Sequence, residues 1–153
     1  MEHFPAPLSR AESDAFAALI RVRFATDGYG LWAVETIDDG RFIGFVGFGV
    51  PSFDADFTPC VEIGWRLAFD AWGHGYATEA ARAALHDGCT RVGLDEIVSF
   101  TATVNERSQR VMQRLGMHFA ETFEHPRLPA GHRLRPHVLY RITCAELARQ
   151  VLP

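Results

Sequence analysis

Apolar residues near the start of the chain recur at the spacing of one helix face. The positions that share this spacing are Phe16, Leu19, Ile20 and Phe24. The preceding sequence Ser9-Arg10-Ala11-Glu12 has the form of a capping box, in which serine and glutamate satisfy the first backbone N–H groups of a helix. We therefore expect a helix that starts near Arg10 and ends before Asp27-Gly28.

Further along the chain, segments rich in β-branched and aromatic residues lie between turn residues, which is typical of strands. They predict strands over 31–37, 41–50, 61–67, 96–104, 117–123 and 137–143. The second of these segments contains Gly44, Gly47 and Gly49, which indicates close approach of a neighbouring backbone or of a ligand.

Two more helices are expected between these strands. One follows a glycine turn and places Ala77, Ala80, Ala81, Ala84 and Leu85 on one face. The other is capped by Asn105, with Gly116 suited to its C-terminal end. After the first helix the order is β-β-β-α-β-α-β-β, which predicts one α/β domain over residues 1–153 with a mixed, mostly antiparallel, twisted sheet flanked by helices.

The composition of the chain excludes several classes of protein and of catalytic chemistry. With 48% hydrophobic residues among 153, the chain can bury a core, which excludes a disordered protein. All 15 basic residues are arginine, so Schiff-base catalysis and a phosphate-loop lysine are excluded. The net charge of −4 argues against a nucleic-acid partner. Residues 1–70 carry a net charge of −6 and residues 71–153 a net +2, so we expect a bound anion in the second half.

The cysteines and the N-terminal sequence indicate the cellular compartment in which we expect the protein. Cys60, Cys89 and Cys144 are odd in number, far apart in sequence and in no C-x-x-C motif, which favours reduced thiols. The first residues lack the pattern of a secretory signal, and no apolar run has the length of a membrane span. We therefore expect a cytoplasmic protein with no membrane partner.

A glycine turn at residues 70–79 is the first candidate site. A helix N-terminus presents unpaired N–H groups and a partial positive charge, and glycines let a phosphate approach them. The turn contains neither a G-x-G-x-x-G motif nor a phosphate-loop lysine. Alone, it fits either a phosphate site or a structural connector.

The second candidate is Asn105-x-x-Ser108, followed by Leu115-Gly116-Met117, which alone fits an ordinary helix cap and helix end. Taken together, the segments EIGWRL, WGHGYATEA and NERSQRVMQRLGM closely resemble the GNAT superfamily of N-acetyltransferases. The resemblance extends over residues 4–143 and is strongest to the branch that includes the enzymes acetylating ribosomal-protein N-termini.

This resemblance implies how acetyl-CoA would bind, with a cofactor-binding core over about residues 61–117. The family pattern Arg/Gln-x-x-Gly-x-Gly/Ala is matched in register, except that tryptophan stands at its first position. The residues implied to hold the pyrophosphate through backbone N–H groups are Trp72, Gly73, His74, Gly75, Tyr76, Ala77 and Thr78. The strand end Trp65-Arg66-Leu67 would pair with the pantetheine arm, and a backbone N–H there would polarise the thioester carbonyl.

The resemblance also gives roles to the next helix. Asn105 would bond the pantetheine, and Ser108 would donate a hydrogen bond to the departing thiolate. Arg107, Arg110 and Arg114 lie nearby in sequence and could reach the phosphates or form a solvated helix face. We include Arg110 among the expected cofactor-binding residues.

Acetylation of an amine also needs a group that accepts its proton. Glu62 is the first candidate, because it alternates with Val61 and Ile63 and would open onto the cleft if those residues face the core. The alternative is an exposed strand glutamate paired with Arg66. Tyr140 is a further candidate, as a thiolate donor or as a core residue.

The loop 124–136 is the most basic segment of the chain. It could contact an acidic or carboxylate-bearing acceptor, or simply cover the sheet. His137 is a second candidate base, although we expect it to hold this loop. The spacings of His125, His132 and His137 match no standard zinc pattern, so no metal is expected.

Family members usually begin with a strand and a helix before the segment resembling EHFPAPLSRAESDAF, and here Met1 stands almost at that point. We expect the first strand and most of the first helix to be missing. The strand at 31–36 would then be an uncovered sheet edge, which favours a homodimer or a partner segment.

The sequence thus predicts acetyl-CoA-dependent transfer of an acetyl group to a primary amine, either a small molecule or a protein N-terminus. An alternative from another class is a non-catalytic acyl-CoA-binding module with the same fold, which would bind acetyl-CoA without releasing thiol. An unrelated nucleotide-binding α/β domain is the third reading, which ATP or NAD binding without CoA binding would support.

Overall fold

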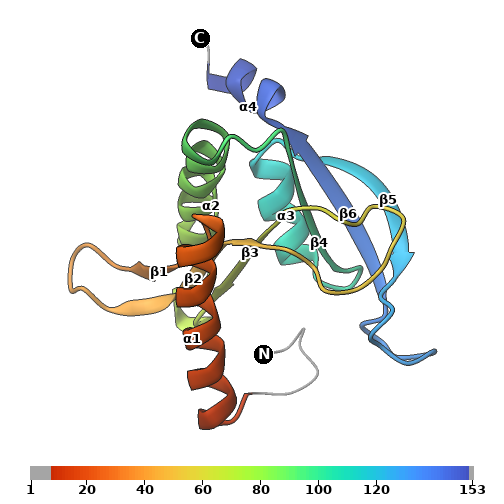
Figure 1. Cartoon of the computed structure of the whole chain (residues 1–153), viewed down its shortest axis with the longest axis horizontal. Coiled ribbons are helices and arrows are strands. Elements are labelled where there is room, and N and C mark those ends of the chain that lie inside the picture. Colours follow the sequence, from red (N-terminus) through yellow and green to blue (C-terminus); the bar gives the residue numbers. More distant parts are fainter. Residues whose placement is uncertain (1–7, 152–153) are drawn as a thin grey trace.

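A computed structural model, which describes residues 8–151, arranges the chain around one six-stranded sheet (Figure 1). The strands are β1 (Leu31–Glu35), β2 (Phe42–Gly49), β3 (Glu62–Leu67), β4 (Glu96–Ala102), β5 (His118–Glu124) and β6 (Pro136–Thr143). Their order across the sheet is β1-β2-β3-β4-β6-β5, and every neighbouring pair is antiparallel except β3 and β4. The predicted mixed, mostly antiparallel α/β fold is confirmed.

The helices are α1 (Arg10–Asp27), α2 (Tyr76–Asp87), α3 (Glu106–Arg114) and α4 (Cys144–Val151), with a 3-10 turn, η1 (Phe69–Ala71), and a π-helical turn, η2 (Gly88–Val92). The expected capping box at Ser9 is present, and Gly28 ends α1 in the left-handed conformation. Helix α4 was not predicted. Within residues 8–151, no helix combines the length and the apolar character needed to cross a membrane.

The main core lies between the sheet and helices α2 and α3. Its fully buried side chains come from both layers and include Phe48, Ile63, Leu85, Ile97 and Met112. A second cluster lies under the loop between β2 and β3, where aromatic side chains cover Val98 and Leu139. The two clusters fix β3 and β4, the strands between which the candidate site lies.

Helix α1 packs on β1 and β2 through aromatic contacts, with Phe16 on Phe45 at 5.7 Å and Phe24 on Trp32 at 5.2 Å between ring centroids. None of its residues is fully buried. In the part of the chain that the structure describes, β1 pairs only with β2, so it forms the edge of the sheet. This position agrees with the edge expected from the sequence, and the segment before residue 8 lies outside the described residues.

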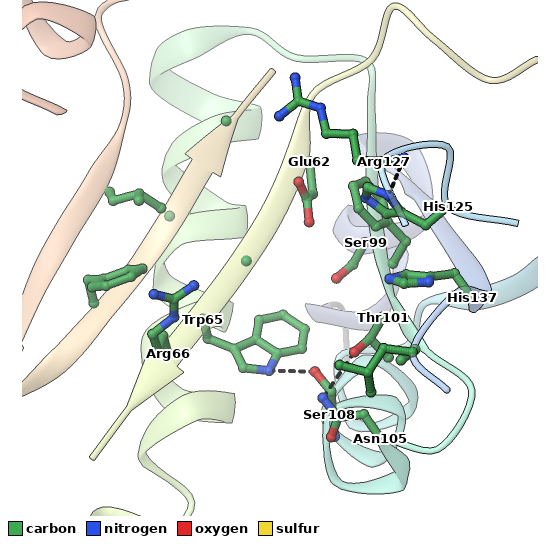
Figure 2. Close-up of a pocket in the computed structure, with 18 of the residues that line it drawn as sticks. Glu62, Trp65, Arg66, Ser99, Thr101, Asn105, Ser108, His125, Arg127 and His137 are labelled. Atoms are coloured by element: carbon green, nitrogen blue, oxygen red, sulfur yellow. Dashed lines mark hydrogen bonds between the residues drawn. The ribbon is translucent and has the colours of Figure 1, made fainter. Parts of the chain in front are cut away.

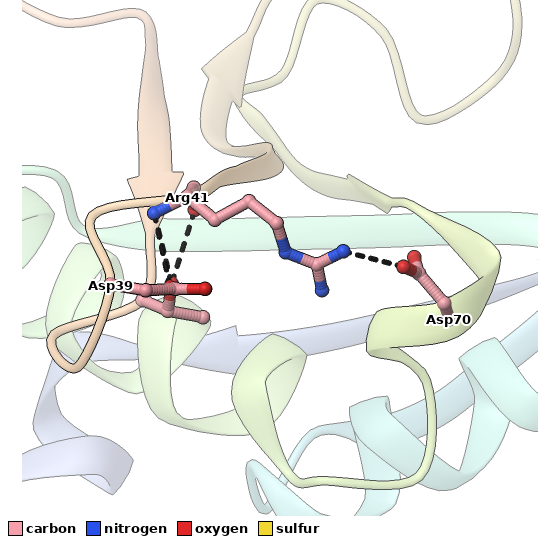
Figure 3. A network of polar contacts seen from close by, with 4 residues as sticks. Asp39, Arg41 and Asp70 are labelled. Atoms are coloured by element: carbon pink, nitrogen blue, oxygen red, sulfur yellow. Dashed lines mark hydrogen bonds and ion pairs between the residues drawn. The ribbon is translucent and has the colours of Figure 1, made fainter.

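A polar network ties the β1–β2 hairpin to η1 (Figure 3). The guanidinium of Arg41 donates to the Asp70 carboxylate at 2.5 Å, and this contact lowers the pKa of Asp70. Within the hairpin turn, Asp39 accepts from the Thr36 hydroxyl and from the Arg41 N–H. Because both partners of the ion pair are exposed, it contributes little stability, but it links the hairpin to the segment before the glycine turn.

The expectation of three reduced cysteines is wrong, because Cys89 and Cys144 form a disulfide. They are 55 residues apart in sequence, and the fold brings their Cα atoms to 5.5 Å by packing η2 near the start of α4. Cys60 is a free, partly buried thiol. The pairing joins two elements whose contact depends on the tertiary fold, so sequence spacing gave no sign of it.

Candidate active site

The parallel strands β3 and β4 diverge where the candidate site begins. Among the described residues they pair only at Glu62 and Val98, where the Val98 N–H donates to the Val61 carbonyl at 3.0 Å. The buried Ser99 hydroxyl then reaches across to the Ile63 carbonyl at 2.9 Å. Past this point a cavity of about 530 Å³ opens between the strands (Figure 2).

The divergence leaves one edge of β3 facing the cavity. The carbonyls of Val61 and Ile63 point toward β4, and successive residues of a strand alternate their direction. The backbone N–H and carbonyl of Trp65 therefore point into the gap, while Ala68 bonds to Ile43 on the β2 side at 2.7 Å. This is the strand edge at which the family resemblance implies pairing with the pantetheine arm.

Two side-chain contacts connect the start of α3 to β4 and to β3, the strands on either side of the gap. The Asn105 side chain caps α3 by accepting from the Ser108 N–H at 3.3 Å, and its amide donates to the Thr101 hydroxyl at 2.9 Å. The indole N–H of Trp65 donates to Ser108 Oγ at 3.0 Å (Figure 2). All four residues line the cavity. The ring of Trp65 packs against the main core, and its indole nitrogen reaches the site.

The glycine turn before α2 has the geometry of an anion site. Gly73 and Gly75 adopt φ values of 82° and 87°, a backbone conformation that L side chains rarely adopt. The first hydrogen bond of α2 runs from the Glu79 N–H to the Gly75 carbonyl, and no side chain caps the helix. The N–H groups of residues 76–78 therefore lack intrahelical partners and lie at the positive end of the helix dipole.

Trp72, which departs from the family pattern, connects this turn to its surroundings. Its indole N–H donates to the Leu67 carbonyl at the end of β3 at 2.9 Å. The guanidinium of Arg107 lies over its ring, 4.9 Å from the centroid, which brings a positive charge beside the turn. Arg110 instead forms an ion pair with Glu106 at 3.0 Å. Of the arginines on α3, Arg107 is the one that contacts the turn through an aromatic ring.

Glu62 lies at the other end of the cavity from Ser108, with its carboxyl directed into the space between the strands (Figure 2). Burial raises the pKa of Glu62 to about 8. A carboxyl in this range is mostly protonated at neutral pH and readily exchanges a proton with an amine. Arg66 lines the same cavity, and its guanidinium lies 5.4 Å from the centroid of the Phe45 ring.

The loop 124–136 forms one wall of the cavity. The sequence left open whether this loop contacts an acceptor or only covers the sheet. His125, Arg127 and His137 line the cavity. The rings of the two histidines are 4.8 Å apart, His137 Nδ1 lies 3.0 Å from the Arg135 carbonyl, and burial lowers the pKa of both imidazoles. The loop thus covers the aromatic cluster on the sheet and also faces the site. Residues 8–151 hold no group of three His, Cys, Asp or Glu side chains arranged for a metal ion.

Tyr140 lies apart from this cavity. It is 6% exposed within the main core, and its hydroxyl accepts from the Gln113 amide at 3.3 Å. Its ring packs edge-on against Phe119. Of the sequence candidates, Glu62, Trp65, Arg66, Asn105 and Ser108 line one cavity, while Tyr140 belongs to the packing beneath α3.

Sequence reasoning missed Ser99, whose hydroxyl on β4 bonds to the Ile63 carbonyl of β3 at the side of the cavity, and the specific contribution of Arg127. Ser99 was read as part of a buried β-branched strand, and only its polar side chain among apolar neighbours could have signalled a special contact. Arg127 was one of three arginines in the loop, and nothing in their spacing separates the one that faces the cavity.

Several known proteins are similar to this chain in sequence. Across 144 residues the chain is 33% identical to the FsC-acetyl coenzyme A-N(2)-transacetylase of Aspergillus fumigatus, covering 88% of this chain and 59% of that one. The chain spans less than two thirds of the length of the curated relatives it matches.

Among solved structures, the GNAT-family acetyltransferase of Bacillus anthracis superimposes with a TM-score of 0.72 at 24% identity, covering 94% of this chain and 80% of that one. The yncA protein of Salmonella typhimurium, whose structure contains acetyl-CoA as its cofactor, gives a TM-score of 0.71 at 21% identity and covers 92% and 80%. Residues 1–118 match the family described as "Acetyltransferase (GNAT) domain", and the chain therefore belongs to the GNAT acetyltransferase family.

Proposed function

We propose that this chain catalyses acetyl transfer from acetyl-CoA to a primary amine by direct attack of the amine on the thioester. The observation that carries the proposal is the gap between β3 and β4, which has a carboxyl of raised pKa at one end and the Trp65–Ser108 pair at the other. One channel thus offers a proton acceptor for the amine and a hydrogen-bond donor for the leaving sulfur.

The described residues fit acetyl-CoA as the donor substrate. Residues 76–78 offer backbone N–H groups to the pyrophosphate without any lysine, and Arg107 supplies charge beside them. The exposed edge of β3 at Trp65 suits an extended amide-containing arm, which would bond like an added strand. Asn105 lies where it can bond the same arm.

In the proposed reaction, the residues at each end of the cavity take part in a different step. Glu62, once ionised, takes a proton from the acceptor ammonium, directly or through water. The amine nitrogen then attacks the thioester carbon, the C–N bond forms and the C–S bond breaks. Ser108 donates a hydrogen bond to the departing sulfur, which takes up the second proton of the amine to give the free thiol. The net products are an amide, CoA thiol and one proton passed through Glu62 to solvent.

The acetylating relative in Aspergillus fumigatus supports a catalytic reading over a binding module. The ribosomal-protein branch, the cytoplasmic location and the homodimer stay predictions from the sequence. Tyr140 is given no catalytic role in this proposal, because it lies outside the cavity lining.

The test is thiol release from acetyl-CoA with a panel of primary amines, together with calorimetric titration of CoA. Gly75→Ala should weaken CoA binding about tenfold, because a side chain strains the turn that presents the N–H groups. Gly93→Ala is the matched control, since Gly93 also has a positive φ, 78°, with open space around it, but it ends η2 beyond the C-terminal end of α2, away from the N–H groups of residues 76–78. CoA binding without thiol release from any amine would instead establish the non-catalytic module.

A further inference from the structure

The wall of the cavity near Glu62 carries positive charge. Arg127 lies at this end of the cavity (Figure 2), and Arg66 lines it further along β3. The Arg127 guanidinium is held in place by the Ser52 carbonyl at 2.7 Å and the Ser52 hydroxyl at 2.6 Å, both through Nη2. Because both acceptors are neutral, these bonds orient the guanidinium without neutralising it.

A second arginine of this loop differs from Arg127, because its charge is paired with a carboxylate. Arg135, in the same loop, pairs with the Glu124 carboxylate at 2.8 Å and donates to the Leu128 carbonyl, so its charge is already matched. The only carboxyl among the described residues that line the cavity is Glu62.

The other titratable groups of the lining carry no negative charge that would offset Arg127. Burial keeps Glu62 mostly protonated at neutral pH, since its pKa is about 8. His125 and His137 have lowered pKa values for the same reason and are neutral there. Arginine stays charged in proteins, so Arg127 gives the wall near Glu62 a positive charge near neutral pH.

Apolar side chains form the rest of this wall, including Phe100, Leu128 and Leu134. They can cover the carbon skeleton of a small acceptor while the arginine binds a planar anion through two N–H groups. A purely cationic amine would meet a positive field here, whereas an amine that carries its own anion would not.

We propose that the acceptor is a small amine that also bears a carboxylate, of the amino-acid class, with the carboxylate bound by Arg127 and the amine facing Glu62. This inference rests on the proposed acetyl transfer. Arg127 then acts as a specificity-determining residue, and Ser52 positions it.

The experiment compares phenylalanine and leucine with their amides and with the amines that lack the carboxyl group, using thiol release from acetyl-CoA. We expect kcat/KM for the acids to exceed that for the amides and amines at least tenfold. The amides are a stringent comparison, because their amino groups lose a proton more easily and would react faster without carboxylate recognition.

Arg127→Gln should remove most of this preference by raising KM for the acids, with little change in KM for acetyl-CoA. Arg133→Gln is the matched control, since Arg133 is an exposed arginine of the same loop outside the cavity lining. Equal use of acids and amides, or a preference that survives in Arg127→Gln, would overturn the inference.

The two proposals fail in different ways. If no amine gives thiol release, the proposed function fails, and calorimetric titration with the same acids and amides still tests carboxylate recognition. Tighter binding of the acids that depends on Arg127 would support it, and equal binding would refute it.

Discussion

The indole N–H of Trp65 on β3 donates to the hydroxyl oxygen of Ser108 on α3 at 3.0 Å. A serine hydroxyl has one proton to donate, and its oxygen accepts from other donors. Because the indole can only donate, the bond leaves the Ser108 proton available to a ligand in the cavity. In the proposed reaction, Trp65 therefore positions Ser108 as a donor toward the sulfur of acetyl-CoA.

Trp65→Phe should lower kcat about tenfold while changing KM for acetyl-CoA little, because the ring packing is kept and one hydrogen bond is lost. The measurement is steady-state kinetics of thiol release. In a Ser108→Ala background the same substitution should have almost no further effect on kcat, since the partner is already gone. Additive losses in the double variant would show that Trp65 acts on something other than Ser108.

The pH dependence of the rate tests Glu62. Burial raises the pKa of this carboxyl to about 8, and only the ionised form accepts a proton, so kcat/KM should rise between pH 6 and pH 9. In Glu62→Gln the rate should fall about a hundredfold or more, and the step near pH 8 should disappear. The step caused by ionisation of the acceptor amine, at higher pH, should remain in both proteins. A profile unchanged by the substitution would place the base elsewhere.

The burial of Glu62 should also make the free energy of unfolding depend on pH. A carboxyl whose folded pKa lies above its ordinary value of 4.5 stabilises the fold while protonated, and this contribution is lost as pH rises from about 4.5 to about 8. Glu62→Gln keeps a neutral side chain at every pH. We therefore expect both proteins to unfold at similar urea concentrations at pH 5, and the variant to be more stable at pH 9 by about 2 kcal/mol or more. Equal stability at pH 9 would mean that Glu62 is well solvated.

Periodicity and turn residues predicted the strand order along the chain and the start of every helix except α4, because these features depend on local spacing. The capping box at Ser9 and the cap at Asn105 are local in this sense, and both are observed. The divergence of β3 from β4 could not be predicted in the same way. It is a relationship between two strands that are far apart in sequence, and among the described residues these strands pair only at Glu62 and Val98.

In the candidate site too, local sequence predicted some residues, and others depend on the tertiary fold. Glu62, Asn105 and Ser108 were found because strand alternation or a helix cap fixes their direction. The contact of Trp65 with Ser108 spans 43 residues of sequence, and Arg127 reaches Ser52 over 75, so only the folded chain brings these pairs together. Resemblance to a family supplied the expected roles of the motif residues. It gave no information about the loop 124–136, which forms the wall of the cavity near Glu62.

The disulfide between Cys89 and Cys144 should contribute measurably to stability. In the chain-entropy estimate, a closed loop of 55 residues corresponds to about 4 kcal/mol. Cys89→Ala should therefore lower the melting temperature by about 10 °C, and a reducing agent should do the same to the unsubstituted protein. Cys60→Ala is the control, because Cys60 is the free thiol of the described chain. If the reductant destabilises Cys89→Ala as much as the parent protein, the stabilisation does not come from this bond.

Arg107 and Arg110 lie one turn apart on α3 and should differ in their effect on CoA binding. Arg107 contacts Trp72 beside the glycine turn, whereas the charge of Arg110 is already paired with Glu106. A guanidinium next to exposed helix N–H groups strengthens phosphate binding through charge and hydrogen bonds. We expect Arg107→Ala to raise the Kd for CoA about tenfold and to weaken its salt dependence.

Arg110→Ala should raise the Kd for CoA less than about threefold, because its loss also frees the Glu106 carboxylate without removing a contact to the turn. Calorimetric titrations of CoA and of dephospho-CoA at two salt concentrations separate the possibilities. If Arg107 acts on the pyrophosphate, Arg107→Ala weakens both ligands equally, since both contain that group. A loss confined to CoA would instead assign Arg107 to the ribose phosphate, and a larger loss in Arg110→Ala would reverse the roles of the two arginines.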